Sequence, residues 1–257
     1  MQIPKMIVFD LDDTLAPSKS ELPQEMANLL TQLLRQTAVA VISGGDIRQF
    51  KTQLLAPLTQ ALGSKQRLLR NLHLMPTCGT RYERYADGSW QTLYNETLTE
   101  GEKRRAIRSL QECARELQLW ESATWGDIIE DRGSQITFSA LGQAAPSEAK
   151  AAWDPTGAKK NALAVAVQKQ LPELAVRSGG STSVDITRAG IDKAYGIKKL
   201  TEHNWITPQQ MLFIGDRLDP AGNDYPVKAL DTVPCVAVKN WRECANLLHE
   251  MLTAIGD

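Results

Sequence analysis

Cysteine is scarce in this chain of 257 residues. Its four cysteines, Cys78, Cys113, Cys235 and Cys244, are widely separated, and no two of them form a C-x-x-C pair. This spacing fits neither a disulfide framework nor a structural zinc site. We therefore expect four reduced thiols.

The chain also lacks an excess of charge and a long apolar run. It has 29 Lys and Arg against 30 Asp and Glu, a formal net charge of -1, which gives no overall attraction to nucleic acid or to an anionic membrane. The longest apolar runs, such as residues 162–167, are too short to cross a bilayer, and the first residues do not resemble a signal peptide. We expect a cytoplasmic protein with no nucleic-acid or membrane partner, whose ligand is a small polar or anionic metabolite.

Two continuously apolar segments, residues 6–9 and 38–42, flank a stretch in which Leu and Met recur every three or four residues. This pattern predicts a strand, a helix and a second strand. Strands without alternation are typical of parallel sheets covered by helices on both faces. Residues 211–214 and 233–238 repeat the pattern near the C-terminus. We therefore predict an α/β fold with a doubly wound, Rossmann-like parallel core sheet built from both ends of the chain.

The middle of the chain has a different pattern, in which alternating segments are separated by helical stretches. These are residues 81–85 and 135–139, and about 100–119 and 158–171. Alternation predicts sheets with one face toward solvent. We predict a smaller α+β cap domain over residues 87–186, inserted into a core of residues 1–86 and 187–257.

Acidic residues follow the predicted core strands. Asp10 and Asp12 end the first strand, and Asp216 lies in the segment GDRLDPAGND, residues 215–224. Ligands of open parallel sheets bind beyond the carboxyl ends of the strands. Mg²⁺ prefers oxygen ligands and is typically held by one or two carboxylates together with a substrate phosphate. We predict that Asp10 and Asp216 supply these carboxylates.

A phosphate bound beside such an ion would lie close to Asp10, whose free oxygen could attack the phosphorus in line and form an aspartyl-phosphate. Asp12 could reach the leaving oxygen, protonate it, and later deprotonate the water or hydroxyl that releases the phosphoryl group. The sequence therefore indicates covalent phosphoryl transfer.

Phosphoryl transfer also requires donors and positive charge around the phosphate oxygens. Ser43, Gly44 and Gly45 offer a hydroxyl and backbone N–H groups where the second strand ends. Lys193 begins a helical pattern and could supply the charge. We predict that these residues bind phosphate.

These segments, in order, resemble the four motifs of the haloacid dehalogenase (HAD) superfamily of phosphotransferases. They are DLDDTL, a serine after the second strand, a lysine before the last β-α unit, and a GD…ND box. GGSTSVDITRAGIDKAYGI and GDRLDPAGND are, more narrowly, similar to the eukaryotic-type phosphomannomutases, whose class IIB cap is inserted between the second and third motifs. The ten-residue length of the last box is the specific part of this resemblance, which touches nearly the whole chain.

The resemblance implies a role for single residues. It makes Asp10 the nucleophile and Asp12 the acid and base, and it puts Ser43 and Lys193 at phosphate-binding positions. The residues expected at the Mg²⁺ site are Asp10, Asp12, Asp216 and Asp224. The residues expected to bind substrate are Lys19, where the family has an arginine, and Gly44, Arg132, Ser183, Asp185 and Asn223.

The cap departs from the family pattern at its arginines. A mutase must hold the distal phosphate of a bisphosphorylated intermediate, for which arginine is suited because it binds phosphate with two parallel hydrogen bonds. Gln143 stands where the family segment has its final arginine, and Trp125 where another would fall. Arg132 alone remains in that stretch. Without the clamp, the sugar should leave after the first transfer, and water should hydrolyse the aspartyl-phosphate.

Three functions therefore remain open. The departures favour a Mg²⁺-dependent phosphatase of a small phosphorylated metabolite such as a sugar phosphate. The alternative is a phosphomannomutase that interconverts mannose 6-phosphate and mannose 1-phosphate. A third hypothesis is a catalytically silent protein that binds a phosphometabolite. Members of the family often form homodimers through their caps, but no stripe of residues in this chain decides the oligomeric state.

Overall fold

The computed structural model describes residues 4–256 and divides the chain into two compact units. The first, here called the core unit, runs up to Asn95 and resumes at Asp192. The second, the cap unit, is Glu96–Ile191. Both bounds of the inserted unit lie further along the chain than the 87–186 expected from the sequence, for reasons given with each sheet below.

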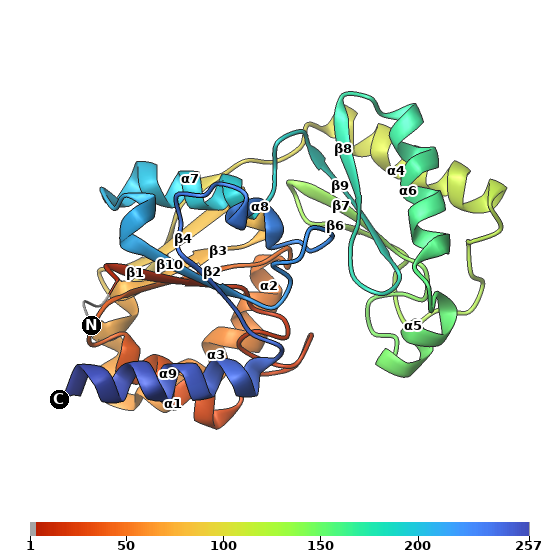
Figure 1. The fold of residues 1–257 in the computed structure, drawn as a ribbon. Helices are drawn as coiled ribbons and strands as arrows, with labels where there is room; N and C mark the ends of the chain where they lie inside the picture. Colours follow the sequence, from red (N-terminus) through yellow and green to blue (C-terminus); the bar gives the residue numbers. More distant parts are fainter. Residues whose placement is uncertain (1–3, 257) are drawn as a thin grey trace. The chain divides into compact units, whose positions relative to one another are not determined.

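The core unit contains a seven-stranded sheet in the order β11-β10-β1-β2-β3-β4-β5 (Figure 1). The first five strands of this order are parallel, and the last two add an antiparallel hairpin. This hairpin moves the domain boundary, because its second strand pairs with the core sheet. The parallel-dominated α/β sheet confirms the predicted fold class. The strands are β1 Met6–Phe9, β2 Ala38–Ile42, β3 Leu72–Met75, β4 Arg81–Ala86, β5 Ser89–Asn95, β10 Met211–Gly215 and β11 Cys235–Ala237.

Helices cover both faces of this sheet, as Figure 1 shows. On one side are α1 Gln24–Leu33, α3 Ala56–Leu62 and α9 Trp241–Gly256, and on the other α7 Lys193–Asn204 and α8 Tyr225–Lys228. The short α2, Ile47–Gln49, continues through a π-helix, Phe50–Leu55, into α3. Single 3-10 segments occur at Gly63–Asn71, Thr77–Gly79 and Pro208–Gln210.

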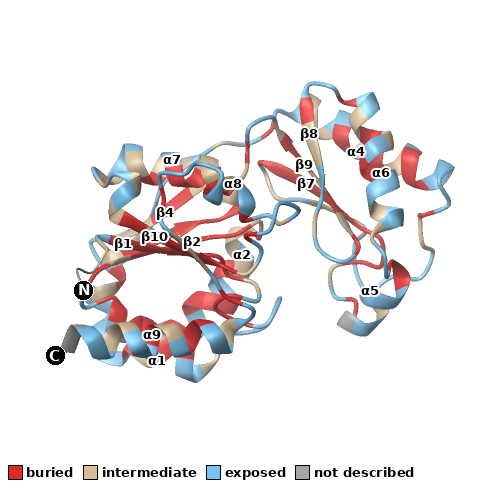
Figure 2. Cartoon of the chain, viewed as in Figure 1, coloured by how far each residue is buried: buried red, intermediate tan, exposed pale blue. Residues whose placement is uncertain are grey.

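The continuous apolar character of the strands follows from this double cover. In β1, Ile7 and Phe9 belong to the apolar cluster that contains α1, α3 and α9 residues, whereas Met6 and Val8 belong to the cluster on the α7 side. All four side chains are buried, as are nearly all residues of the neighbouring β2 and β3 (Figure 2). Each strand therefore ends abruptly, at the point where the cover stops and polar residues begin.

The cap unit consists of a four-stranded antiparallel sheet with helices on one face (Figure 1). The sheet order is β6-β7-β9-β8, with β6 Ile129–Asp131, β7 Gln135–Ser139, β8 Leu174–Ser178 and β9 Ser183–Arg188. Its helices are α4 Glu100–Glu116, α5 Ser147–Trp153 and α6 Ala158–Gln170. Because β9 pairs along its length with β7 and β8, the unit extends past the predicted residue 186.

One expectation about the cap sheet is wrong. Alternation in β7 predicts a solvated face, yet its polar residues are as buried as its apolar ones. Ile136 and Phe138 join the apolar cluster with α4 and α6. The polar residues instead form hydrogen bonds within the unit: the Gln135 amide donates to Thr137, and Ser139 pairs with a serine of β9.

No helix among residues 4–256 is both long and apolar enough to span a membrane.

Candidate active site

Four charged side chains meet at the carboxyl end of two neighbouring strands. Asp10 follows β1 and Asp216 follows β10, and these strands pair in parallel, with the Asp10 N–H donating to the Ile214 carbonyl at 3.0 Å. Lys193 is the first residue of α7, and Asp224 directly precedes α8. The parallel pairing thus brings together residues that are more than 200 positions apart in sequence.

Lys193 is buried between two carboxylates. Its Nζ atom lies 2.6 Å from Oδ1 of Asp10 and 2.5 Å from Oδ1 of Asp224, and 1% of its side chain is exposed. The other oxygen of Asp224 accepts a hydrogen bond from the Arg217 N–H at 3.1 Å. Burial lowers the pKa of Lys193, but the two carboxylates outweigh this effect and raise it above its usual value. The ammonium is therefore permanently charged.

The carboxylates outnumber this one ammonium. Oxygens of Asp10, Asp216 and Asp224 lie within 4.8 Å of one another. Burial raises the pKa of Asp10 well above its usual value, against the lowering effect of Lys193. Burial, with the charge of Asp224, also raises the pKa of Asp216. The site thus carries an excess of negative charge that a cation would relieve.

The donor set of this site fits Mg²⁺. Its ligand atoms are all carboxylate oxygens, which suit magnesium rather than a softer metal. Asp10 and Asp216 each follow a strand at the same edge of the sheet, as predicted. Asp12 is not among the three grouped acids, and its role as a ligand stays a prediction.

Gly215 makes room for Asp224. A Cβ atom at this position would overlap the Asp224 carboxylate and would lie 2.8 Å from the Phe213 ring. Packing therefore requires glycine at this position of the GD pair, since any side chain there would displace Asp224, the acid that holds Lys193.

The turn at residues 43–45 follows β2, the neighbour of β1. Ser43 is buried, and its hydroxyl oxygen accepts a hydrogen bond from the Gly45 N–H at 3.1 Å. Two backbone N–H groups of the next turn support it, because Thr77 donates to the Gly45 carbonyl and Cys78 to the Ser43 carbonyl, at 2.8 and 2.9 Å. A Cβ added at Gly44 would meet nothing within 4 Å.

Asp12 is held separately, by donors that the sequence does not reveal. Its oxygens accept hydrogen bonds from the side-chain amides of Gln49 and Gln53 and from the backbone N–H of Lys19. Lys19 itself is exposed, with a left-handed φ of 56°. Asn223, a predicted substrate residue, is exposed too. A further residue missed by the sequence reasoning is Thr14, whose hydroxyl donates to Asp216 at 3.5 Å.

Two of the predicted substrate residues of the cap unit lie on one strand. Ser183 and Asp185 are alternate residues of β9, and each is paired with a β7 residue. The Thr137 hydroxyl donates to Asp185 at 2.7 Å, while the Ser183 and Ser139 hydroxyls share a hydrogen bond of 3.2 Å. Both side chains belong to one hydrogen-bonded face of the cap sheet.

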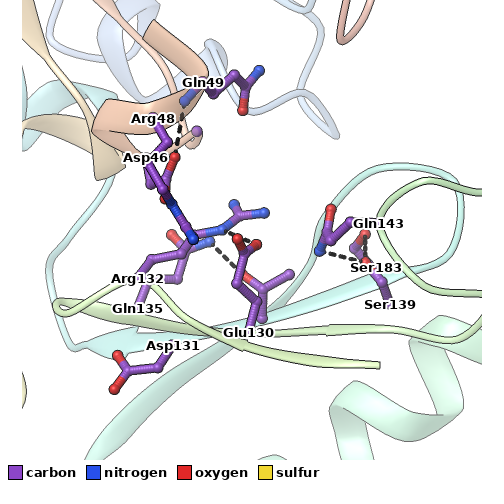
Figure 3. A network of polar contacts seen from close by, with 12 residues as sticks. Asp46, Arg48, Gln49, Glu130, Asp131, Arg132, Gln135, Ser139, Gln143 and Ser183 are labelled. Atoms are coloured by element: carbon purple, nitrogen blue, oxygen red, sulfur yellow. Dashed lines mark hydrogen bonds and ion pairs between the residues drawn. The ribbon is translucent and has the colours of Figure 1, made fainter. Parts of the chain in front are cut away.

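Two basic residues of the cap unit, Arg132 and Lys150, have partners within it. Arg132 forms an ion pair with Glu130, with 2.8 Å between Nε and the carboxylate (Figure 3). The Gln143 amide donates to the Ser139 hydroxyl at 2.9 Å, also visible in Figure 3. Lys150, which the sequence reasoning did not single out, donates to the Gln143 carbonyl at 2.9 Å. The position expected to hold a clamping arginine is thus occupied by a neutral amide.

Comparison with known proteins identifies relatives along nearly the whole chain. The sequence model of the eukaryotic phosphomannomutase family matches residues 26–254. A phosphomannomutase of Encephalitozoon cuniculi is 21% identical over 98% of this chain and 94% of the relative. A phosphomannomutase of Schizosaccharomyces pombe is 24% identical over 86% of this chain and 84% of the relative.

Solved structures share the fold at lower identity. A Plasmodium falciparum IMP-nucleotidase mutant with bound IMP is 14% identical, with a TM-score of 0.74 over 98% of this chain and 67% of that one. A haloacid dehalogenase-like hydrolase from Bacteroides thetaiotaomicron is 17% identical, with a TM-score of 0.63 over 96% and 99% of the two chains. These neighbours confirm a HAD-like fold.

Proposed function

Because this chain belongs to the eukaryotic phosphomannomutase family, a HAD-superfamily family of phosphoryl-transfer enzymes, we propose that it is a phosphomannomutase acting through Asp10. The observation that carries the proposal is the buried group of Asp10, Asp216, Asp224 and Lys193. Such a group has no structural need to exist, since three carboxylates, two of them buried, outnumber the one ammonium and destabilise the fold unless they bind something. The substrate class, a mannose phosphate, comes from the names of the relatives.

In the first half of the reaction, Asp10 attacks the phosphorus of the substrate and the bond from phosphorus to the sugar oxygen breaks. Lys193 holds one Asp10 oxygen at 2.6 Å, which leaves the other oxygen as the nucleophile. The same ammonium offsets negative charge on the transferring group, which is the largest electrostatic demand of phosphoryl transfer. Asp224 keeps Lys193 in this position.

Asp10, Asp216 and Asp224 are the residues that would hold Mg²⁺. When bound, Mg²⁺ would neutralise charge on the phosphate oxygens and on the carboxylates around it. The Ser43 hydroxyl, which lies where β2 ends, is suited to one of the remaining phosphate oxygens.

Asp12 performs the proton transfers. It donates a proton to the sugar oxygen that leaves, and it later removes one from the hydroxyl that takes the phosphoryl group from Asp10. In a mutase the acceptor is the free hydroxyl of a bound sugar monophosphate, which becomes a bisphosphate and then gives its other phosphoryl group to Asp10. In a phosphatase the acceptor is water. The chemistry at Asp10 is the same in both.

Hydrolysis is the second candidate, favoured by one observation in the cap unit. Gln143 is neutral and bonded to Ser139, and Arg132 is paired with Glu130. The sequence also favours a phosphatase, because Gln143 and Trp125 stand where the family has arginines. The family match and the names of the relatives support the mutase better, and Lys150 adds a cation that the sequence reasoning had not counted.

A single assay distinguishes the two. The chain is incubated with mannose 1-phosphate, Mg²⁺ and a hexose bisphosphate activator, and both mannose 6-phosphate and inorganic phosphate are measured. The proposal expects isomerisation to exceed phosphate release. Asp10→Asn should reduce turnover by at least about 10³-fold, because it removes the nucleophile.

The matched control is Asp13→Asn, an exposed neighbour with a left-handed φ of 62° that asparagine tolerates. It should retain wild-type turnover. Phosphate release without isomerisation would make the chain a phosphatase. Full activity in a folded Asp10→Asn variant would overturn both functions, and no turnover by the wild-type chain would favour a silent binding protein.

A further inference from the structure

Two glutamines of one helical segment hold the carboxylate of Asp12. The Gln49 amide nitrogen lies 3.0 Å from Oδ2 of Asp12, and the Gln53 amide nitrogen lies 3.1 Å from Oδ1. The two amides also bond to each other, since Gln49 donates to the Gln53 side-chain oxygen at 2.8 Å. With the Lys19 N–H at 2.7 Å, both Asp12 oxygens have donors. The carboxylate is thus fixed in rotation as well as in position.

The helix that carries these glutamines is irregular at this point. Residues Phe50–Leu55 form a π-helix between α2 and α3. The π-helix is rare, and it appears mostly as short insertions that are frequent at functional sites. Here the Gln53 carbonyl accepts a hydrogen bond from the Leu22 N–H at 2.8 Å. Gln53 therefore ties down the loop that follows Asp12 through its backbone, and Asp12 itself through its side chain.

Gln53 is buried, so its side-chain amide requires hydrogen-bond partners within the protein. Only 3% of the residue is exposed, and its neighbours Phe50 and Leu54 belong to the main apolar cluster. An amide in such surroundings destabilises the fold unless its hydrogen bonds are satisfied, whereas leucine would pack there without that requirement. Asp12 and Gln49 satisfy it.

Gly45 supplies an independent observation. A Cβ atom at this position would overlap the amide oxygen of Gln49 and lie 2.6 Å from its Cδ. The backbone of Gly45 does not have a left-handed φ, so alanine is conformationally tolerated there. The missing side chain thus serves as space for Gln49, over the same turn that presents Ser43.

We propose that Gln49 and Gln53 are positioning residues that aim the Asp12 carboxyl group at the oxygen that leaves phosphorus. This inference rests on the proposed phosphoryl transfer from a sugar to Asp10. A sugar alkoxide is a poor leaving group and needs a proton as the bond to phosphorus breaks, so a misdirected Asp12 slows its departure. p-Nitrophenolate leaves without a proton. Loss of either glutamine therefore slows sugar phosphates selectively.

The test compares these two leaving groups in Gln49→Leu and Gln53→Leu. With mannose 1-phosphate, Mg²⁺ and a hexose bisphosphate activator, we expect kcat to fall by about 10- to 100-fold with little change in KM. With p-nitrophenyl phosphate, the pre-steady-state burst of p-nitrophenol measures the first transfer alone and should change by less than about 2-fold. Gln60→Leu, at an exposed position of α3, is the matched control and should behave as wild type.

A double-mutant cycle uses Gly45. Gly45→Ala should reproduce the selective loss in the wild-type background and should add nothing in Gln49→Ala, because the clash is with the Gln49 side chain. If Gln53→Leu does not fold, the Gln49 variants still test the proposal, because Gln49 is only half-buried. Equal losses with both substrates, or no loss with either, would overturn the positioning role. A wild-type chain inactive on both would overturn the proposed function itself.

Discussion

His73 is a titratable side chain that β3 carries into the interior of the core unit. Its Nδ1 atom and the Tyr82 hydroxyl share a hydrogen bond of 2.6 Å, and Tyr82 also bonds to the Asn204 side chain. Burial, reinforced by the charge of Arg84, lowers the pKa of His73 from its usual 6.5 to about 3. The folded chain therefore keeps the imidazole neutral at pH values where the unfolded chain would protonate it.

From this difference we expect the free energy of unfolding to fall as the pH drops below 6.5. In that range His73 binds a proton in the unfolded state but not in the folded state. This difference lowers the free energy of unfolding by up to about 1.4 kcal/mol per pH unit. Urea denaturation of His73→Asn should show a shallower decline than wild type, because asparagine does not titrate. Identical slopes in wild type and His73→Asn would contradict the prediction.

Residues of the candidate site differ in how well the sequence predicts them. Asp10, Asp216 and Lys193 could be predicted because each lies where a strong element ends or begins, and parallel pairing brings such ends to one edge. Gln49 and Gln53 could not, because glutamine is an ordinary helix residue. Their role depends on a π-helix and on side-chain contacts across the chain, neither of which leaves a periodic signal.

At the scale of elements, the turn Thr77–Gly79 supports the turn at residues 43–45. Two of its backbone N–H groups donate to the carbonyls of Ser43 and Gly45. Thr77 and Cys78 have left-handed φ values of 48° and 57°. Residues other than glycine adopt this conformation at a cost of about 1 to 3 kcal/mol each. Thr77 and Cys78 keep this strained conformation because it directs their N–H groups to the carbonyls of the turn at residues 43–45.

The same turn packs against α7, and this contact yields a prediction. Gly79 has a φ of +86°, and a Cβ there would lie 2.6 Å from the Gly196 Cα. Gly79→Ala should therefore lower the free energy of unfolding by about 2 to 4 kcal/mol, from backbone strain and overpacking together.

Gly88→Ala separates the two causes. Gly88 has a similar φ of +79° but nothing within 4 Å of its Cβ position, so its substitution should cost only about 1 to 2 kcal/mol from the backbone. Chemical denaturation of both variants measures the difference. Equal losses would mean that the approach of α7 to the turn does not matter.

Element types were predictable from the sequence, while both bounds of the inserted unit lie further along the chain than predicted. The continuous apolar strands fixed the parallel sheet, and periodicity indicated α4 and α6 to within a few residues. The predicted cap boundary at residue 87 cuts through the hairpin of β4 and β5. Asp87-Gly88 is a strong two-residue hairpin signal, with left-handed φ at both positions. This signal predicts that β4 and β5 form one hairpin, which extends the core unit to Asn95.

On the scale of the whole molecule, the chain has separate apolar cores. The cluster of the cap unit contains Leu110, Phe138 and Leu163, and none of its members comes from the core unit. Phe213 belongs to a cluster formed by the core sheet and α7. Each unit thus has an apolar core of its own, and a truncation in that core should destabilise that unit first.

Separate cores predict separate responses to truncation. Phe138→Ala and Phe213→Ala should each cost about 3 to 5 kcal/mol, but in different unfolding transitions when the wild-type chain is scanned by calorimetry. Hydrogen exchange would assign the transitions, with lost protection confined to residues 96–191 in Phe138→Ala. A single transition that both variants shift equally would show instead that the two units unfold as one.

The inserted unit is joined to the rest of the chain at only two peptide bonds, Asn95 to Glu96 and Ile191 to Asp192. Each of the two sheets takes its strands from one side of these joints. A chimaeric gene cut there would exchange a whole cassette without breaking a strand pairing or moving a codon for Asp10, Lys193 or Asp216. Recombination at these joints would thus exchange the inserted unit while the residues of the candidate active site are inherited unaltered.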